Sequence, residues 1–141
     1  MEFFKKIGNV EYEGTQTKNP LAFRFYNPEE VIAGKTMREQ LRFAASYWHT
    51  FCGDGSDLFG RGTADKCFGG KSEMDIAINK AHAAFELMNK LGIDYFCFHD
   101  RDIAPEGKTL SESNARLDEI KSILKDLMKE HNKKLLWGTA N

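Results

Sequence analysis

The chain has 141 residues, an ordinary length for a single domain, and its 41% of hydrophobic residues are enough to form a core. Its formal net charge of −1 gives no general attraction to phosphate backbones or anionic lipid, so we expect neither a nucleic-acid nor a membrane partner. A soluble cytoplasmic protein is favoured because there is no signal-peptide pattern, no apolar run of ~20 residues and no CxxC pair among the cysteines, Cys52, Cys67 and Cys97.

The N-terminal quarter of the chain predicts little regular structure. Residues 1–36 keep no period of 2 or 3.6 and are interrupted by glycine and proline, so we expect an irregular arm. Three aromatic side chains are expected to pin this arm to a larger body: Phe23, Phe25 and Tyr26. The apolar segment LRFAASYW at 41–48 then predicts a strand, and the glycine-rich residues 52–72 predict a long loop.

A helix is predicted over residues 73–91. Ser72 can cap its first turn together with Asp75, three residues further on. Gly92 is a typical stop signal. Small and apolar residues recur at helical spacing along this segment, and the small alanines allow close approach to a sheet.

Two more strands flank a second helix. The segments IDYFCF at 93–98 and KLLWGT at 134–139 predict strands, and residues 109–132 between them predict a helix. Thr109 and Glu112 have the spacing of a capping box at the start of this helix.

This alternation of strands and helices predicts an α/β protein with a parallel sheet. An open doubly wound sheet and a closed eight-stranded barrel both begin in this way. The barrel is favoured because no glycine-rich phosphate turn follows the first strand, and because polar and aromatic residues gather where each strand ends. We therefore predict an arm over 1–36, followed over 37–141 by the first three βα units of a TIM (β/α)8 barrel. A complete barrel needs roughly 250 residues, so this barrel is incomplete.

The strongest chemical signal is the segment FHDRD after the second strand. His99 at the strand end and Asp102 three residues later can form a hydrogen-bonded pair, in which the carboxylate orients the imidazole for proton exchange. Simple capping of the following loop is an alternative interpretation. Direct metal binding is a third, which we do not favour because magnesium and manganese prefer several oxygen ligands in an octahedral array.

Both tryptophans stand at predicted strand ends. Trp48 and Trp137 can wall a pocket and stack on a sugar, although core packing is the more common fate of a tryptophan. Because neighbouring residues of a strand point to opposite faces, we expect Trp48 rather than His49 to face the site. Phe59, between glycines of the long loop, has the pattern of an ordinary loop anchor.

A family resemblance rests on three segments at these spacings. RFAASYWHTFCGDGSDLFG, FHDRDIAPEG and KLLWGTAN together resemble the longer, N-terminally extended class of xylose isomerases, and the resemblance extends over essentially the whole chain. It implies an eight-stranded barrel with a C-terminal extension, assembled as a homotetramer. It also implies interconversion of D-xylose and D-xylulose, and less efficiently of D-glucose and D-fructose, by ring opening and a metal-assisted hydride shift.

The resemblance also implies roles for individual residues. His99 would assist opening of the cyclic sugar, and Asp102 would orient His99. Trp48 and Trp137 would line the substrate pocket, and Thr139 would lie near the substrate end of the third strand.

Other components would come from outside this segment. Phe59 matches an aromatic residue that reaches into the substrate site of a neighbouring subunit. The two divalent metals of the family, magnesium, manganese or cobalt, are held by residues of later strands, so we expect no metal to be bound by this segment. The remaining barrel segment is therefore an expected partner, and the segment alone is expected to be inactive.

Two alternatives remain open from the sequence. A metal-dependent nuclease on a similar barrel would need basic residues near the site, whereas Arg61, Lys66 and Arg101 are scattered and balanced by acids. The chain by itself can also be an inactive folding or assembly fragment.

Overall fold

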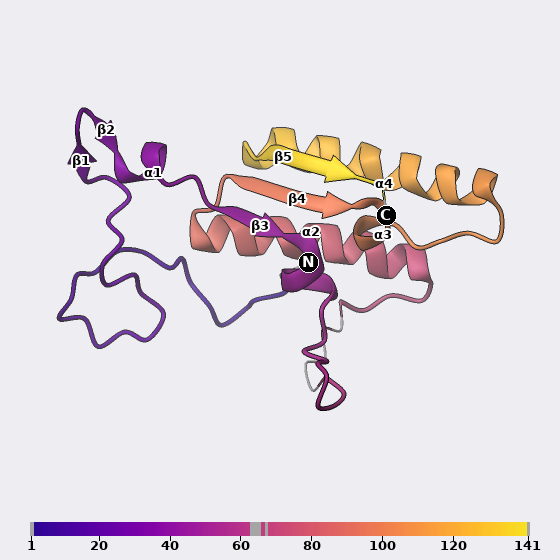
Figure 1. The fold of residues 1–141 in the computed structure, drawn as a ribbon, viewed down its shortest axis with the longest axis horizontal. Coiled ribbons are helices and arrows are strands. Elements are labelled where there is room, and N and C mark those ends of the chain that lie inside the picture. The colour runs from indigo at the N-terminus through magenta and orange to yellow at the C-terminus, as the bar shows by residue number, and fades with distance from the viewer. Residues whose placement is uncertain (1, 63–65, 67, 141) are drawn as a thin grey trace.

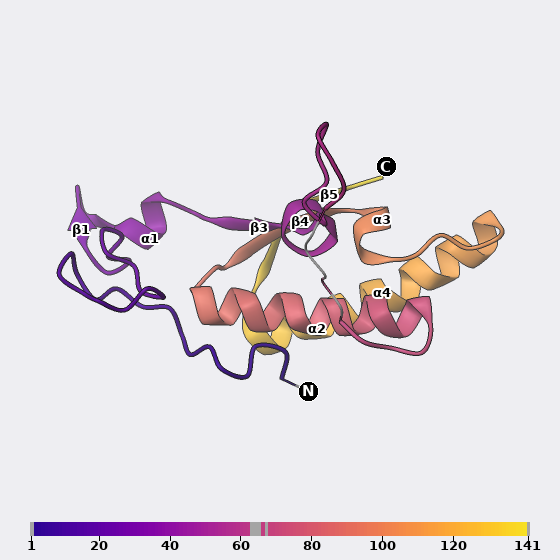
Figure 2. The ribbon, with the colours of Figure 1, turned by 90° about the horizontal axis from the view of Figure 1, so that it is seen from below.

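A computed structural model describes residues 2–62, 66 and 68–140 of the chain. Its centre is a parallel sheet with the strand order β3-β4-β5, made of Ala44–Ser46, Tyr95–His99 and Lys134–Thr139. The two long helices, α2 (Glu73–Leu91) and α4 (Leu110–His131), lie side by side against one face of the sheet (Figures 1 and 2). The chain is thus an α/β protein with a parallel sheet.

Helix α2 has the caps that the sequence predicts. The Ser72 hydroxyl accepts from the Asp75 amide, and the Asp75 carboxylate accepts from the Ser72 amide in return. Gly92 ends the helix in the left-handed conformation, at a φ of 66°, which glycine adopts without steric cost. Alanines and larger apolar residues of the inner face are fully buried, with Phe85 and Met88 at 0% exposure.

Helix α4 forms only half of the predicted capping box. The Thr109 hydroxyl accepts from the Glu112 amide, as expected. The Glu112 side chain, however, accepts from the Lys108 amide and pairs with Arg116, so it does not reach back to the Thr109 amide. The competing contacts of this carboxylate are the reason that the reciprocal bond is missing.

The first strand is shorter than the predicted range 41–48. Only Ala44–Ser46 pair with β4, because the chain turns into a π-helical segment, η1 (Trp48–Cys52), directly after Tyr47. Strand β4 extends one residue beyond the predicted 93–98 and begins two residues later. Strand β5 coincides with the predicted range 134–139.

The arm contains more regular structure than the prediction for 1–36 allowed. Strands β1 (Val31–Ile32) and β2 (Lys35–Thr36) form an antiparallel hairpin, and helix α1 (Met37–Gln40) follows. Ala33 and Gly34 close the hairpin at φ values of 51° and 79°, a turn geometry that suits a two-residue hairpin. Local turn chemistry, rather than hydrophobic period, therefore determines this part of the arm.

Two of the three expected aromatic pins make ring contacts. Tyr26 stacks edge-on against Phe23 and Phe43, with centroids 5.8 and 5.2 Å away. Phe25 is 83% exposed, so its contact with a larger body stays a prediction. The beginning of the arm is held by Glu86 of α2, whose carboxylate accepts from the amides of Phe3 and Phe4 at 2.7 and 2.9 Å.

In the described part of the chain, neither long helix is apolar enough to cross a lipid bilayer.

Candidate functional site

The histidine and aspartate after β4 form a hydrogen-bonded pair. His99 caps the short helix α3 (Asp100–Ile103), and Asp102 is the third residue of that helix. One carboxylate oxygen, Oδ2 of Asp102, accepts from the His99 backbone amide at 2.7 Å and lies 3.0 Å from Nδ1 of the imidazole. The local capping geometry of α3 therefore also orients the ring.

This contact selects one tautomer of the imidazole. An ionised carboxylate can only accept hydrogen bonds, so Nδ1 of His99 carries the proton that points to Asp102. In the neutral ring, Nε2 is then the free proton acceptor. The side chain of His99 is 33% exposed and that of Asp102 is 13% exposed, which leaves the imidazole accessible while its partner is largely covered.

Both indoles lie beside this imidazole. The ring centroid of Trp48 is 4.8 Å from that of His99, and the centroid of Trp137 is 5.7 Å from it. The two indoles are 5.3 Å apart. Trp48 comes from η1, His99 from the end of β4 and Trp137 from β5, so three separate segments form one aromatic cluster.

Sheet register explains part of this convergence. Trp137 pairs with Cys97, and His99 follows Cys97 by two residues, so both rings project from the same face of the sheet. Thr139 pairs directly with His99 at the carboxyl end of the sheet. The carboxyl ends of parallel strands meet at one edge, where α/β proteins usually place their sites.

The reason given for Trp48 was wrong, although its position near His99 agrees with the expectation. Strand alternation does not separate Trp48 from His49, because both residues belong to the π-helical segment and their rings are 5.7 Å apart. His49 is exposed, and its carbonyl accepts from the Lys66 ammonium at 3.1 Å. The helical turn, not the pleat of a strand, brings Trp48 to the imidazole.

Phe59 lies apart from the aromatic cluster. Its side chain is 95% exposed at the tip of a loop, where Asp57 Oδ1 accepts from the amides of Phe59 and Gly60. Within this chain the structure brings together His99, Asp102, Trp48 and Trp137, while Phe59 makes no contact with them.

Cys52 contacts the backbone of Asp102 and was not predicted as a site residue. The Cys52 thiol lies 3.5 Å from the Asp102 carbonyl oxygen and 3.4 Å from the Lys80 ammonium. Burial raises the pKa of Cys52, against the opposing effect of Lys80, so the thiol keeps its proton and donates to the carbonyl. The π-helical turn places Cys52 here, and no sequence pattern indicated that turn. Cys67 lies outside the described residues.

The described side chains do not fit a metal. Across residues 2–62, 66 and 68–140, no three His, Cys, Asp or Glu side chains are grouped so that they could hold an ion. In the His99–Asp102 pair, one carboxylate oxygen is already engaged by both the ring and the backbone amide. The described side chains therefore do not offer the ligand set that two divalent ions require.

The fold and the site together define the class of protein. It is an α/β protein with a parallel sheet, and a hydrogen-bonded histidine–aspartate pair lies beside two indoles at the carboxyl edge of that sheet. No protein-family model matches the chain. The whole chain is 55% identical to the xylose isomerases of Halalkalibacterium halodurans and Geobacillus kaustophilus, and 54% identical to that of Listeria welshimeri. Over its full length the chain belongs to the xylose isomerase family, and it spans 32% of the length of these relatives.

Proposed function

We propose that the protein carrying this chain is an aldose–ketose isomerase that interconverts D-xylose and D-xylulose, and D-glucose and D-fructose. The observation that carries the proposal is the orientation of the His99 imidazole by Asp102, 3.0 Å away, directly beside two indoles. The family relationship supports the same activity, since the curated relatives are named xylose isomerases.

In this proposal His99 opens the cyclic sugar. Nε2, free because Nδ1 is hydrogen-bonded to Asp102, takes the proton of the anomeric hydroxyl. The electron pair of that O–H bond forms the C1 carbonyl, the bond between C1 and the ring oxygen breaks, and the ring oxygen receives a proton from the imidazolium. The imidazole of His99 thus returns to its neutral form, and the product is the open-chain aldose.

Asp102 and the indoles have supporting roles. Asp102 stabilises the imidazolium that forms during the transfer and keeps the ring in one orientation. Trp48 and Trp137 offer flat apolar surfaces on which the C–H face of a sugar can stack, and they exclude water from the reacting hydroxyl. Thr139, paired with His99 in the sheet, is proposed to lie near the substrate.

The remaining features of the family are part of the same proposal. They are the complete eight-stranded barrel, the homotetramer, the cytoplasmic location, the reach of Phe59 into a neighbouring subunit, and dependence on magnesium, manganese or cobalt. Residues outside this segment would have to hold those metals, because the described side chains do not fit them. The proposed ring opening uses only residues of this chain.

The isolated segment is proposed to be inactive. Every residue of β5 is exposed, and an apolar groove beside it is lined by residues of α4 and the sheet that include Leu124, Met128 and Leu135. Exposed strand edges and apolar grooves favour association, which suits a segment that needs further chain to complete its fold.

The test uses the complete protein with magnesium and D-xylose. His99→Asn and His99→Gln should depress turnover to xylulose by about 10²-fold, in the range of lost acid–base catalysis. His82→Asn is the matched control, because His82 is exposed on α2 and touches none of the site residues. Unchanged turnover in both His99 variants would remove the imidazole from the mechanism, and no xylulose from the wild-type protein would refute the function.

A further inference from the structure

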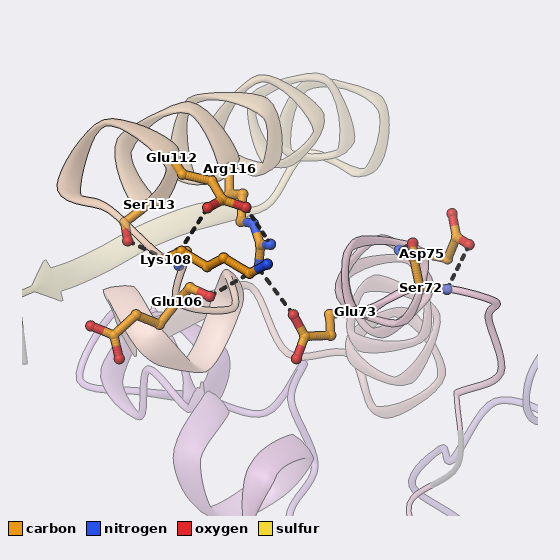
Figure 3. A network of polar contacts seen from close by, with 9 residues as sticks. Ser72, Glu73, Asp75, Glu106, Lys108, Glu112, Ser113 and Arg116 are labelled. Atoms are coloured by element: carbon orange, nitrogen blue, oxygen red, sulfur yellow. Dashed lines mark hydrogen bonds and ion pairs between the residues drawn. The ribbon is translucent and has the colours of Figure 1, made fainter.

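The segment that follows α3, residues 104–109, is hydrogen-bonded to side chains in the first turns of α4. Between Ile103 and Leu110 the chain has no regular structure, yet three of its backbone groups are bound by side chains of that helix (Figure 3). The Gly107 amide donates to Ser113 Oγ at 3.0 Å, and the Lys108 amide donates to Glu112 Oε2 at 2.7 Å. The third group is the Glu106 carbonyl, which accepts from Arg116 Nη1 at 2.9 Å.

Arg116 is the centre of this arrangement. Its guanidinium also donates to Glu73 of α2 at 3.0 Å and to Glu112 of its own helix at 2.7 Å. Figure 3 shows the guanidinium between the two helices and the connecting segment. A planar guanidinium presents several donors in a fixed geometry, so one side chain here joins α2, α4 and the backbone at Glu106. The Arg116 side chain is only 22% exposed.

The segment is also packed too closely to shift without cost. A Cβ added at Gly107 would lie 2.7 Å from both Glu112 Cβ and the Ser113 amide nitrogen. Both neighbours belong to the start of α4, so the backbone at 107 sits directly on the helix. A Cβ carbon essentially never lies this close to a non-bonded heavy atom, so a side chain at this position would push the segment away from α4.

This fastening lies close in sequence to the histidine–aspartate pair. Asp102 is followed by Ile103 and Ala104, which are 3% and 2% exposed and packed into the core. Only Pro105 then separates these two buried residues from Glu106, and the Glu106 carbonyl accepts a hydrogen bond from Arg116. Glu106 thus lies only four residues after Asp102, the third residue of α3, whose carboxylate orients His99.

We propose that Arg116 is a positioning residue for the His99–Asp102 pair: by holding residues 104–109 against α4, it fixes α3 and thus the orientation of the imidazole. Arg116 touches neither member of the pair and acts only through the backbone. The catalytic consequence rests on the proposed function, whereas the structural consequence for the pair does not. A shift of about 1 Å at a catalytic group is enough to lower a rate substantially.

Two variants loosen the segment by different chemistry. Arg116→Met removes all the guanidinium contacts while keeping a long apolar stem, and Gly107→Ala leaves every charge in place but forces the backbone off α4. The matched control is Arg38→Met. Arg38 forms an equally well-made ion pair with Asp94, with a 2.8 Å contact from Nε, but Asp94 stands before the start of β4, at the other end from His99.

The first readout is the proton on Nδ1 of His99, observed by NMR in the complete protein. Both loosening variants should exchange this proton with water about tenfold faster, or lose its resonance, because the hydrogen bond to Asp102 is no longer held in place. Arg38→Met should leave it unchanged. Thermal melts check that each variant is folded at the assay temperature, and a general loss of stability alone would not single out this proton.

The second readout is turnover of D-xylose. Both loosening variants should lower kcat about tenfold with KM changed less than about twofold, since no substrate contact is lost. If the exchange rate and the resonance of the His99 Nδ1 proton were unchanged in folded Arg116→Met and Gly107→Ala proteins, the positioning role would be overturned, whatever the turnover. If wild-type protein made no xylulose but both variants altered the proton, the proposed function would fail while the positioning role stood.

Discussion

A buried hydroxyl gives the sharpest test of the packing behind the site. Tyr47 is 1% exposed, and its ring packs against Phe51, Phe96 and Phe98 with centroids 4.9 to 6.3 Å away. Its hydroxyl is buried without a hydrogen-bond partner in the described part of the chain. The substitution Tyr47→Phe removes only this oxygen and keeps the aromatic contacts.

The expected effect on stability is a gain. A buried polar group without a partner costs about 1–3 kcal/mol, so removing it should raise the free energy of unfolding by about 1 kcal/mol. The Tm of the protein should rise accordingly. Urea unfolding of wild-type and Tyr47→Phe proteins at pH 7 measures the difference.

A second measurement at alkaline pH checks the same environment. Burial raises the pKa of Tyr47 above its ordinary value, with smaller contributions from Cys52 and Asp102. The contribution that a raised folded-state pKa makes to the free energy of unfolding is fully present below the unfolded-state pKa of about 10. Above that pH the contribution falls by about 1.4 kcal/mol for each pH unit, because the tyrosine hydroxyl ionises in the unfolded chain. Tyr47→Phe should lose stability less steeply between about pH 10 and 11.

One result would refute this reasoning. If Tyr47→Phe were less stable than wild type by more than about 1 kcal/mol at pH 7, with an equal alkaline slope, the hydroxyl would have to donate a hydrogen bond in the folded protein. Unchanged m-values are the control that both proteins unfold from the same compact state.

Three further predictions concern the edges of the fold. Hydrogen bonding to Arg38 lowers the pKa of Asp94 in the folded protein. The resulting stabilisation of the fold is present above about pH 4 and is lost as the pH falls through the lower folded-state pKa. In urea titrations at different pH values, Arg38→Met should therefore show a smaller loss of stability on acidification. Glu86→Gln should speed hydrogen exchange of the Phe3 amide, measured by mass spectrometry, while helix amides stay protected. Ser72→Ala should lower the unfolding free energy by about 1 kcal/mol, and an unchanged urea midpoint would contradict the observed cap.

The two long helices follow almost entirely from local sequence signals. Ser72 and Gly92 mark the ends of α2, and the alanines between them form the face that packs on the sheet. These features depend on residues within one or two turns, so they can be read from the chain. Strand β5 was equally clear because its apolar run is bounded on both sides.

Local signals were less informative where another contact competes with the one that the sequence pattern suggests. LRFAASYW has the composition of a long strand, yet at Trp48 the chain leaves the sheet in a π-helical turn that buries Phe51 in the core. Glu112 has the spacing of a capping box but is bound by the Lys108 amide and Arg116 instead. Burial of Phe51 depends on tertiary packing, whereas both partners of Glu112 lie only four residues from it and compete locally with the Thr109 amide.

The sequence by itself determined the α/β order, the ends of the helices and the spacing that places His99 three residues before Asp102. These properties depend on backbone preferences and on side chains that meet within a few residues. Only the tertiary structure decided that Trp48 and Trp137 lie beside that imidazole and that Arg116 holds the backbone at Glu106. Such contacts join residues far apart along the chain, so their geometry depends on how the sheet and helices pack together.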